Sequence, residues 1–346
     1  MSKVYIGIDL AAKTCVGAVR DEEGKLVYLR EFPTGEKHLV SFVESSEGEA
    51  TVLLEECDLA YWARRVILPH AERVEVADPK RNSWIHKDPI KNDRIDAKKL
   101  AEIAFLGSYH PVYHTPDKSI YALHLAVKAY DKLTRKTVAQ KNQIKARFRA
   151  QGIICEGSRV YGVRGRAEAL SRVENPAVRE IISADYDILD FLLRERARAK
   201  RRFLTMASGI PVVRAFQAIP GVGPYVAAVF CAYVKCPGRF SDARKLWRYS
   251  RLGITQCVSG GKDLKRQRLD RMGNGSLKDI SMTAFRGAMH AAGDNRFKRA
   301  YANTLANTGS QLHARLTVQR KILQVMWAMW LHGTPYDDGN MPKRWA

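Results

Sequence analysis

Apolar and polar residues alternate with a period of two in several short segments of the first hundred residues, which predicts β-strands. Other segments carry apolar residues at helical spacing. The predicted strands are residues 4–9, 15–20, 26–32, 51–56 and 73–78, and the predicted helices are residues 36–45, 60–68 and 93–106. The first three strands form an antiparallel meander, and helices and strands alternate after it. This order predicts an α/β domain with one mixed sheet flanked by helices.

The middle of the chain predicts two long helices. Residues 117–150 contain neither glycine nor proline, and 34 helical residues would span about 50 Å. A second helical pattern begins at Asn175 and Pro176, a capping residue followed by proline, and runs to about residue 206. The glycine-containing stretch between them favours an antiparallel coiled-coil hairpin that serves as a spacer or a dimerisation arm.

The last third of the chain predicts a compact, mostly α-helical domain. Residues 219–224 read Ile-Pro-Gly-Val-Gly-Pro before an apolar helix, the pattern of a helix-hairpin-helix, so the amides at Gly221 and Gly223 are candidates for binding a phosphate of nucleic acid. Further helices are predicted at residues 241–251, 277–292 and 311–331. We therefore expect three domains, at residues 1–112, 113–207 and 208–346.

The charge is distributed unevenly between these parts. The chain of 346 residues has a formal net charge of +22. Residues 1–110 hold 16 Lys and Arg against 19 Asp and Glu, whereas residues 111–346 hold 42 against 17, a net of +25. A field of one sign on this scale is typical of proteins that bind a polyanion, and nucleic acid is the commonest such partner.

Several classes of protein are excluded by composition. The longest nearly apolar stretches, residues 225–234 and 323–331, fall short of the roughly 18 residues that a membrane-spanning helix needs. The first residues do not resemble a signal peptide. Six scattered cysteines without a Cys-x-x-Cys pair favour a reducing compartment and no structural zinc. We expect a cytoplasmic protein without a membrane partner.

Carboxylates follow the ends of the predicted strands. Asp9 ends the first strand, Glu55 and Glu56 end the strand at residues 51–56, and Asp93 and Asp96 lie three apart on one helix face. The order of elements is that of the ribonuclease H-like fold, in which these ends meet at the centre of the sheet. A group of carboxylates without histidine or cysteine suits Mg²⁺, with Mn²⁺ as a substitute, and two such ions catalyse phosphodiester chemistry.

The resemblance of the chain to a known family is carried by blocks along its whole length. The N-terminal blocks are Tyr5-Ile-Gly-Ile-Asp-Leu-Ala-Ala-Lys13, the Leu-Leu-Glu-Glu-Cys segment from residue 53 with Tyr61-Trp62, and Lys91-Asn-Asp-Arg-Ile-Asp-Ala97. The C-terminal blocks are residues 219–224, Arg239-Phe-Ser241, Leu252-Gly253, Ser259-Gly-Gly261 and Gly273-Asn274 with Leu277. In this order they resemble the DEDD transposases of bacterial insertion sequences, which have a RuvC-like domain and act as bridge-RNA-guided serine recombinases.

This resemblance implies an enzyme, a DNA transposase or site-specific recombinase, and assigns roles to its residues. The four acids fall on Asp9, Asp93, Asp96 and one glutamate, for which the spacing to Tyr61-Trp62 favours Glu56 and the spacing to Cys57 favours Glu55. The family's nucleophile falls on Ser259, which would form a covalent 5′-phosphoserine. Glycines follow this serine and permit close approach of DNA. The candidate phosphate-binding side chains near it are Lys262, Lys265, Arg266, Arg268 and Arg271.

The resemblance also implies partners. They are target and donor DNA, a guide or bridge RNA, and further copies of the chain in a dimer or tetramer with a composite active site, in a bacterial or archaeal cytoplasm at the nucleoid. The long basic helices would hold nucleic-acid backbones without reading their sequence. Among their basic residues, Tyr121, Tyr130, Phe148 and Tyr161 are candidates for stacking on bases.

Three other readings remain open from the residues alone. A metal-dependent nuclease of the Holliday-junction resolvase type would use the acids and leave Ser259 structural. An actin-like sugar kinase or ATPase begins with a similar strand, but Asp9-Leu10-Ala11 lacks the expected glycine after the acid. A DNA-binding protein without catalysis would keep the fold and the charge.

Overall fold

The computed structural model describes residues 2–79, 92–255, 258–259, 262–263 and 268–339. The chain forms two compact units, Met1–His114 and Thr115–Ala346. In the described part of the chain, no helix combines the length and the apolar character needed to cross a membrane.

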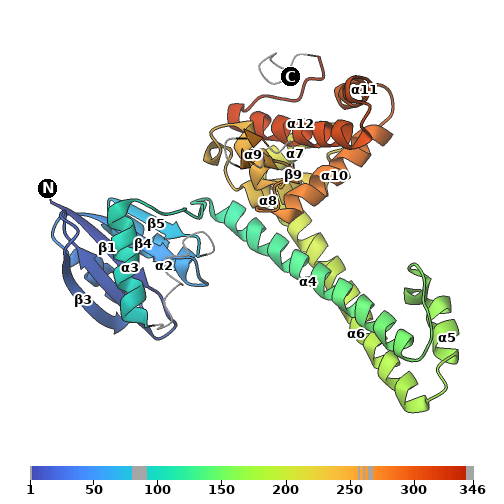
Figure 1. Cartoon of the computed structure of the whole chain (residues 1–346), viewed down its shortest axis with the longest axis horizontal. Coiled ribbons are helices and arrows are strands. Elements are labelled where there is room, and N and C mark those ends of the chain that lie inside the picture. The colour runs from blue at the N-terminus through green and yellow to red at the C-terminus, as the bar shows by residue number, and fades with distance from the viewer. Residues whose placement is uncertain (1, 80–91, 256–257, 260–261, 264–267, 340–346) are drawn as a thin grey trace. The chain divides into compact units, whose positions relative to one another are not determined.

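The N-terminal unit is a five-stranded mixed sheet with helices on both faces (Figure 1). Its elements are β1 (Lys3–Asp9), β2 (Thr14–Arg20), β3 (Leu26–Pro33), α1 (Glu36–Glu44), β4 (Glu49–Glu55), α2 (Ala60–Ile67), the short η1 (Leu68–His70), β5 (Arg73–Ala77) and α3 (Asp93–Leu106). The strand order is β3-β2-β1-β4-β5, with β1 antiparallel to β2 and parallel to β4. The predicted mixed α/β sheet is confirmed, and so is the helix at residues 93–106.

The alternation of side chains along the central strands assigns each residue to one face of this sheet. On β1, Ile6 and Ile8 are fully buried in the core that α1 and α2 cover. The intervening residues point to the opposite face because successive side chains in a strand alternate. On that face Tyr5 packs edge-on against Phe105 of α3, with ring centroids 5.3 Å apart. The face that α3 covers is therefore also the face of Asp9.

The C-terminal unit is mostly helical. Its elements are α4 (Lys118–Ala150), η2 (Arg159–Tyr161), α5 (Val163–Ser171), α6 (Pro176–Ser208), α7 (Pro211–Phe216), α8 (Pro224–Val234), η3 (Pro237–Arg239), α9 (Ala243–Tyr249), α10 (Gly275–His290), α11 (Arg296–Thr308) and α12 (Gln311–His332), with the two-residue strands β6 (Ile254–Thr255), β7 (Val258–Ser259), β8 (Lys262–Asp263) and β9 (Arg268–Leu269). The apolar helix α8 is buried from Val226 to Val234 and lies at the centre of the core. The sequence did not predict α5 or α11.

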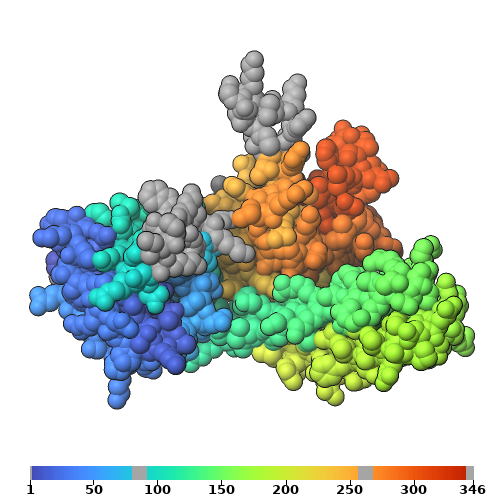
Figure 2. Space-filling view, turned by 60° about the horizontal axis from the view of Figure 1, so that its bottom comes forward, coloured from blue at the N-terminus to red at the C-terminus, as the bar shows by residue number. Residues whose placement is uncertain are grey.

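The two long helices pack side by side (Figure 2). Near the start of α4, Tyr130 meets Phe203 of α6 with ring centroids 5.3 Å apart. Further along α4, Gln140 and Gln143 donate to the buried carboxylate of Asp185 on α6, at 3.1 and 2.9 Å. Pairing of the beginning of α4 with the end of α6 shows the antiparallel arrangement, and the buried amide–carboxylate bonds fix the register of the two helices.

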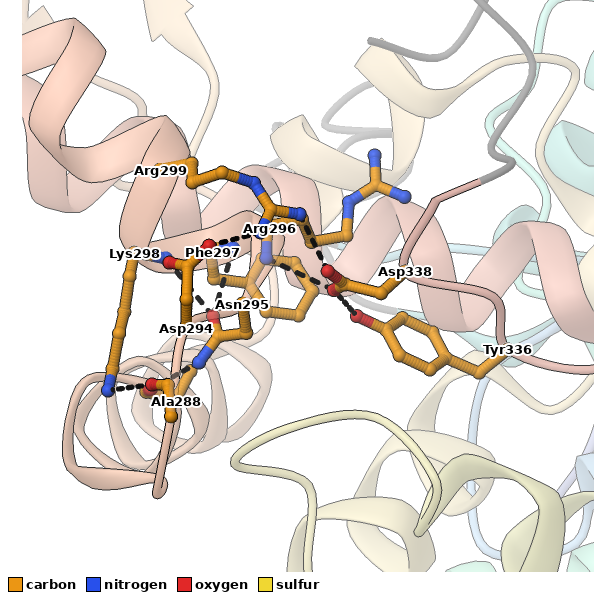
Figure 3. Close-up of polar contacts among 10 residues, drawn as sticks. Ala288, Asp294, Asn295, Arg296, Phe297, Lys298, Arg299, Tyr336 and Asp338 are labelled. Carbon is orange, nitrogen blue, oxygen red and sulfur yellow. Dashed lines mark hydrogen bonds and ion pairs between the residues drawn. The ribbon is translucent and has the colours of Figure 1, made fainter.

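The segment after α12 is tied to the beginning of α11 by one carboxylate (Figure 3). Asp338 accepts hydrogen bonds from the backbone N–H of Arg296 at 3.0 Å, from the Arg299 guanidinium at 2.6 Å and from the Tyr336 hydroxyl at 2.6 Å. The buried Asn295 caps the same helix end. Because the N-terminus of a helix is positive, a carboxylate there stabilises α11.

Helix α3 lies directly against strand β1 at Gly7. A Cβ atom built at Gly7 would lie 2.2 Å from the backbone N of Ala101 and 2.4 Å from the backbone O of Ala97. Both neighbours are backbone atoms that a change of rotamer cannot move. Only glycine at position 7 allows the helix to lie directly on the strand.

We predict that Gly7→Ala destabilises the N-terminal unit by about 1–3 kcal/mol, because the new methyl group forces α3 away from β1. Thermal unfolding followed by circular dichroism measures this loss. The control is Gly35→Ala, whose backbone is extended and whose new methyl would meet only the His38 side chain, at 3.4 Å. Equal stability of the two variants would show that the contact is not tight.

Candidate active site

Asp9 and Glu55 come from the ends of the two central strands. The parallel register of β1 and β4 pairs Ile8 with Leu54, so Asp9 and Glu55 are the next residues along two adjacent strands. On β4, Leu54 belongs to the core on the α1 and α2 side, whereas Leu53 packs with the buried residues of α3. By alternation, Glu55 lies on the α3 face together with Asp9.

The other two acids lie in the first turn of α3. The Asn92 side chain caps this helix by accepting from the backbone N–H of Arg94 at 3.0 Å. Asp93 and Asp96 follow three residues apart, so they share one face. Since α3 packs on Gly7, its first turn reaches the end of β1, where the positive end of the helix favours negative charge.

The electrostatics of Asp9 show that these acids form a group. Burial, together with the charges of Asp93, Asp96 and Glu55, raises the pKa of Asp9 from 3.8 to about 6, against the opposing effect of a hydrogen bond from the backbone of Leu10. Like charges close together disfavour further ionisation. The structure therefore brings together four of the five acids that the sequence singled out.

The fifth acid, Glu56, has a different partner. Its Oε2 atom lies 2.7 Å from Nε2 of His114, a side chain that is only 7% exposed and that lies beside the ring of Tyr61. The charges that raise the pKa of Asp9 include Glu55 and not Glu56. Between the two glutamates that the sequence left open, the geometry favours Glu55.

The four acids offer only carboxylate oxygens, the ligands that Mg²⁺ and Mn²⁺ prefer. Burial, and then repulsion by the neighbouring carboxylates, raises the pKa of Asp9, and a divalent cation among these acids would relieve the repulsion. Across the described ranges, no three Asp, Glu, His or Cys side chains approach closely enough to form a metal cage. Because all four side chains are carboxylates, their chemistry nevertheless fits a divalent cation. Asp9, Glu55, Asp93 and Asp96 are the residues that would hold it.

Ser259 lies on a two-stranded ladder of the C-terminal unit. It ends β7 and pairs with Lys262 of β8, and the preceding β6 pairs with β9 through Thr255 and Arg268. Arg268 and the exposed Arg271 line a groove beside this second ladder. The other candidates, Lys265 and Arg266, lie outside the described residues.

The remaining candidates for nucleic-acid contact lie in different settings. A Cβ atom at Gly221 would meet the backbone O of Ala284 at 2.2 Å, so this glycine packs against α10, whereas Gly223 is exposed at the start of α8. Phe148 is fully buried and Tyr130 packs on Phe203. The prediction that Phe148 stacks on bases is wrong, because its ring fills the core of the helical hairpin.

Two family models match the chain. Residues 6–150 match a DEDD transposase model of the IS110 group, described as a transposase, and residues 213–302 match the model described as transposase, IS116/IS110/IS902 family. The chain carries the transposase domains of the IS110 family. It is an enzyme that acts on DNA, a transposase of an insertion sequence. The search of curated proteins gave no match.

The two matched regions of the transposase contain the two groups of candidate residues. The four acids at the strand ends and in the first turn of α3 lie within residues 6–150, and Ser259 with its basic neighbours lies within residues 213–302. Enzymes with the DEDD domain generally use divalent metal ions. The sequence did not identify His114 as the partner of Glu56, because the two residues are 58 positions apart.

We predict that the stability of the metal-free transposase depends on pH through Asp9. Its pKa is about 6 in the folded state and 3.8 in the unfolded chain, so its contribution to stability is fully present below pH 3.8 and is lost as the pH rises through about 6. Asp9→Asn removes this loss. The melting temperature of the variant relative to wild type should therefore rise across this window and then level off.

Thermal melts with a chelator present measure this difference across the pH window. The exposed Asp58, which lies after β4, provides the control variant Asp58→Asn, for which no rise is expected. A difference between Asp9→Asn and wild type that stays constant with pH would contradict the burial of Asp9 and its repulsion by the other three carboxylates.

Proposed function

We propose that this transposase cuts and rejoins DNA through a covalent 5′-phosphoserine at Ser259, with Mg²⁺ held by Asp9, Glu55, Asp93 and Asp96. Mn²⁺ is the expected substitute, since it accepts the same oxygen ligands. The observation that supports this most strongly is the coupling of Asp9 to three carboxylates from two other segments of the chain. A structural protein gains nothing from such repulsion, whereas perturbed acids of this kind are common at functional sites.

The sheet supports a ribonuclease H-like, RuvC-like assignment for the N-terminal unit. An antiparallel meander of three strands precedes two parallel strands, in the order β3-β2-β1-β4-β5, and the acids lie at the ends of the two central strands. For the antiparallel pair α4 and α6 we propose a coiled-coil arm that joins copies of the chain. A homo-oligomer, either a dimer or a tetramer, would then combine the acids of one copy with Ser259 of another in a composite site.

The proposed reaction conserves the number of phosphodiester bonds. The Ser259 Oγ atom attacks the phosphorus, a bond from the phosphorus to Oγ forms, and the bond to the 3′ oxygen breaks and leaves a free 3′-hydroxyl. The 3′-hydroxyl of another strand then attacks the phosphoserine and restores the serine. Divalent cations at the carboxylates would supply charge stabilisation at the attacking and leaving oxygens. Because no bond energy is lost, strand exchange requires no ATP.

We also propose that a bridge RNA guides this reaction. Exposed basic residues follow both long helices, among them Lys132, Lys136, Arg194, Lys200, Arg201 and Arg202. Such residues hold phosphates and fix the position of a duplex without reading its bases. A protein of this kind would leave the choice of target to base pairing.

We predict that Ser259→Ala lowers DNA cleavage by at least about a thousandfold and abolishes covalent protein–DNA adducts, because the nucleophilic oxygen is removed. DNA binding should be retained. Adducts with a labelled DNA substrate are measured on denaturing gels in the presence of Mg²⁺. The control is Ser241→Ala, which removes an exposed serine of the same matched region and should leave adduct formation intact.

If Ser259→Ala cleaves DNA as fast as the wild type, the proposed nucleophile is wrong. The carboxylates alone would then support the second reading, a metal-dependent nuclease of the resolvase type.

A further inference from the structure

A basic groove lies beside the strands that lead to Ser259. Two adjoining hollows of about 790 and 500 Å³ share Arg251, Gly275 and Asp279 in their walls. The larger one is bounded by Thr255 and Arg268, the paired residues of the ladder β6–β9. The groove therefore begins at the base of the segment that carries the candidate nucleophile.

Arg251 is held in this groove at the cost of a strained backbone. It has a φ angle of 56°, which is unfavourable for a residue with a side chain. Its Nε donates to the backbone O of Gly273 at 2.8 Å, and a Cβ atom at Gly275 would lie 3.3 Å from its Nη1 atom. A guanidinium has five N–H groups, and this bond to Gly273 uses one of them. Lys235, with a φ angle of 65°, is also in this conformation, but it lines neither hollow. Backbone strain of this kind is found at functional positions more often than elsewhere.

Glycine makes the turn that receives this arginine. Gly273 has a φ angle of 111°, and a Cβ atom there would lie 2.5 Å from the backbone O of Tyr249. Asn274 then caps α10 by accepting from the backbone N–H of Leu277 at 3.0 Å. The turn thus places the guanidinium of Arg251 over the first turn of a 16-residue helix, whose N-terminus is positive.

The charges in the groove favour an anion. Its basic side chains are Arg135, Arg251, Arg268, Arg271 and Lys278, and its acidic ones are Asp131, Asp270 and Asp279.

Two of these acids are engaged within the protein. Asp131 accepts from the hydroxyls of Tyr233 and Ser276, each at 2.6 Å. Asp270 accepts from the backbone N–H of Met272 at 2.8 Å and lies 3.8 Å from Arg248. These bonds hold the two carboxylates in place, and the five basic side chains still outnumber the three acidic ones, which leaves an excess of positive charge for a ligand.

One polar group of the groove also points to a ligand with acceptor oxygens. Thr134 lines the smaller hollow, and its buried hydroxyl oxygen has no hydrogen-bond partner among the residues that the structure describes. A hydroxyl and guanidinium N–H groups together match the oxygens of a phosphate.

We propose that this groove binds a phosphodiester group of the DNA strand next to the bond that Ser259 attacks, with Arg251 and Lys278 as its positioning residues. The inference rests on the proposed function for the choice of strand. Arg251 supplies a planar fork for two phosphate oxygens, and Lys278, on the next turn of α10, supplies a second charge. The groove thereby fixes the backbone on one side of the serine.

The test measures DNA binding by full-length protein in a Ser259→Ala background, so that no cleavage intervenes. The probe is a short fluorescent DNA duplex, and its dissociation constant is measured over a range of salt concentrations. Arg251→Gly and Lys278→Ala should each weaken binding about tenfold and reduce the salt slope by about 1, because each removes one phosphate contact. Lys278→Arg should restore binding.

The control is Arg286→Ala, which removes the same charge from an exposed position of the same helix α10 and should change neither quantity. Arg251→Gly also relieves the strained backbone, so its melting temperature should not fall. A weaker binding at unchanged stability therefore reports the lost contact and not misfolding.

Three results would overturn the proposal. Equal effects of Arg251→Gly, Lys278→Ala and Arg286→Ala would show diffuse attraction without a site. Unchanged DNA binding by Arg251→Gly, with Mn²⁺ binding lost in Asp279→Asn, would show a cation site. If Arg251→Gly and Lys278→Ala weaken the binding of an RNA probe but not of the DNA duplex, the groove binds RNA. Because no variant needs to cleave DNA, failure of the groove is distinguishable from failure of the serine mechanism.

Discussion

The direct packing of α3 on the backbone of β1 positions the candidate acids of the N-terminal unit. The helix can approach so closely only because residue 7 has no side chain. This contact carries the first turn of α3, with Asp93 and Asp96, to the strand end that carries Asp9. The parallel register with β4 then adds Glu55. Gly7, which has no side chain, thus determines where the four candidate acids lie.

The repulsion that results is the functional signal of the N-terminal unit. Folding buries Asp9 and brings it within the electrostatic reach of three other carboxylates, and both effects raise the pKa of Asp9. Such a group is stable when a cation neutralises it, and the family of DEDD transposases generally uses divalent metal ions. The geometry and the family match therefore point to the same chemistry by independent routes.

Much of the N-terminal unit could be predicted from the sequence, because its strands and helices show clear apolar periodicity. The choice between Glu55 and Glu56 could not, since it depends on which face of β4 each side chain takes and on His114, a distant residue. Helix α11 was missed because it is polar overall and Phe297 is its one fully buried residue. Arg251 was missed because its backbone strain and its place over α10 exist only in the folded chain.

The convergence of the acids is tested most directly by Mn²⁺ binding, followed by electron paramagnetic resonance. The matched variants Glu55→Gln and Glu56→Gln each replace one carboxylate oxygen by an amide nitrogen, and the two changes lie at adjacent positions. The account predicts saturable Mn²⁺ binding that Glu55→Gln weakens by at least about tenfold and that Glu56→Gln leaves unchanged. Equal affinities of the two variants, or no saturable binding by wild type, would contradict it.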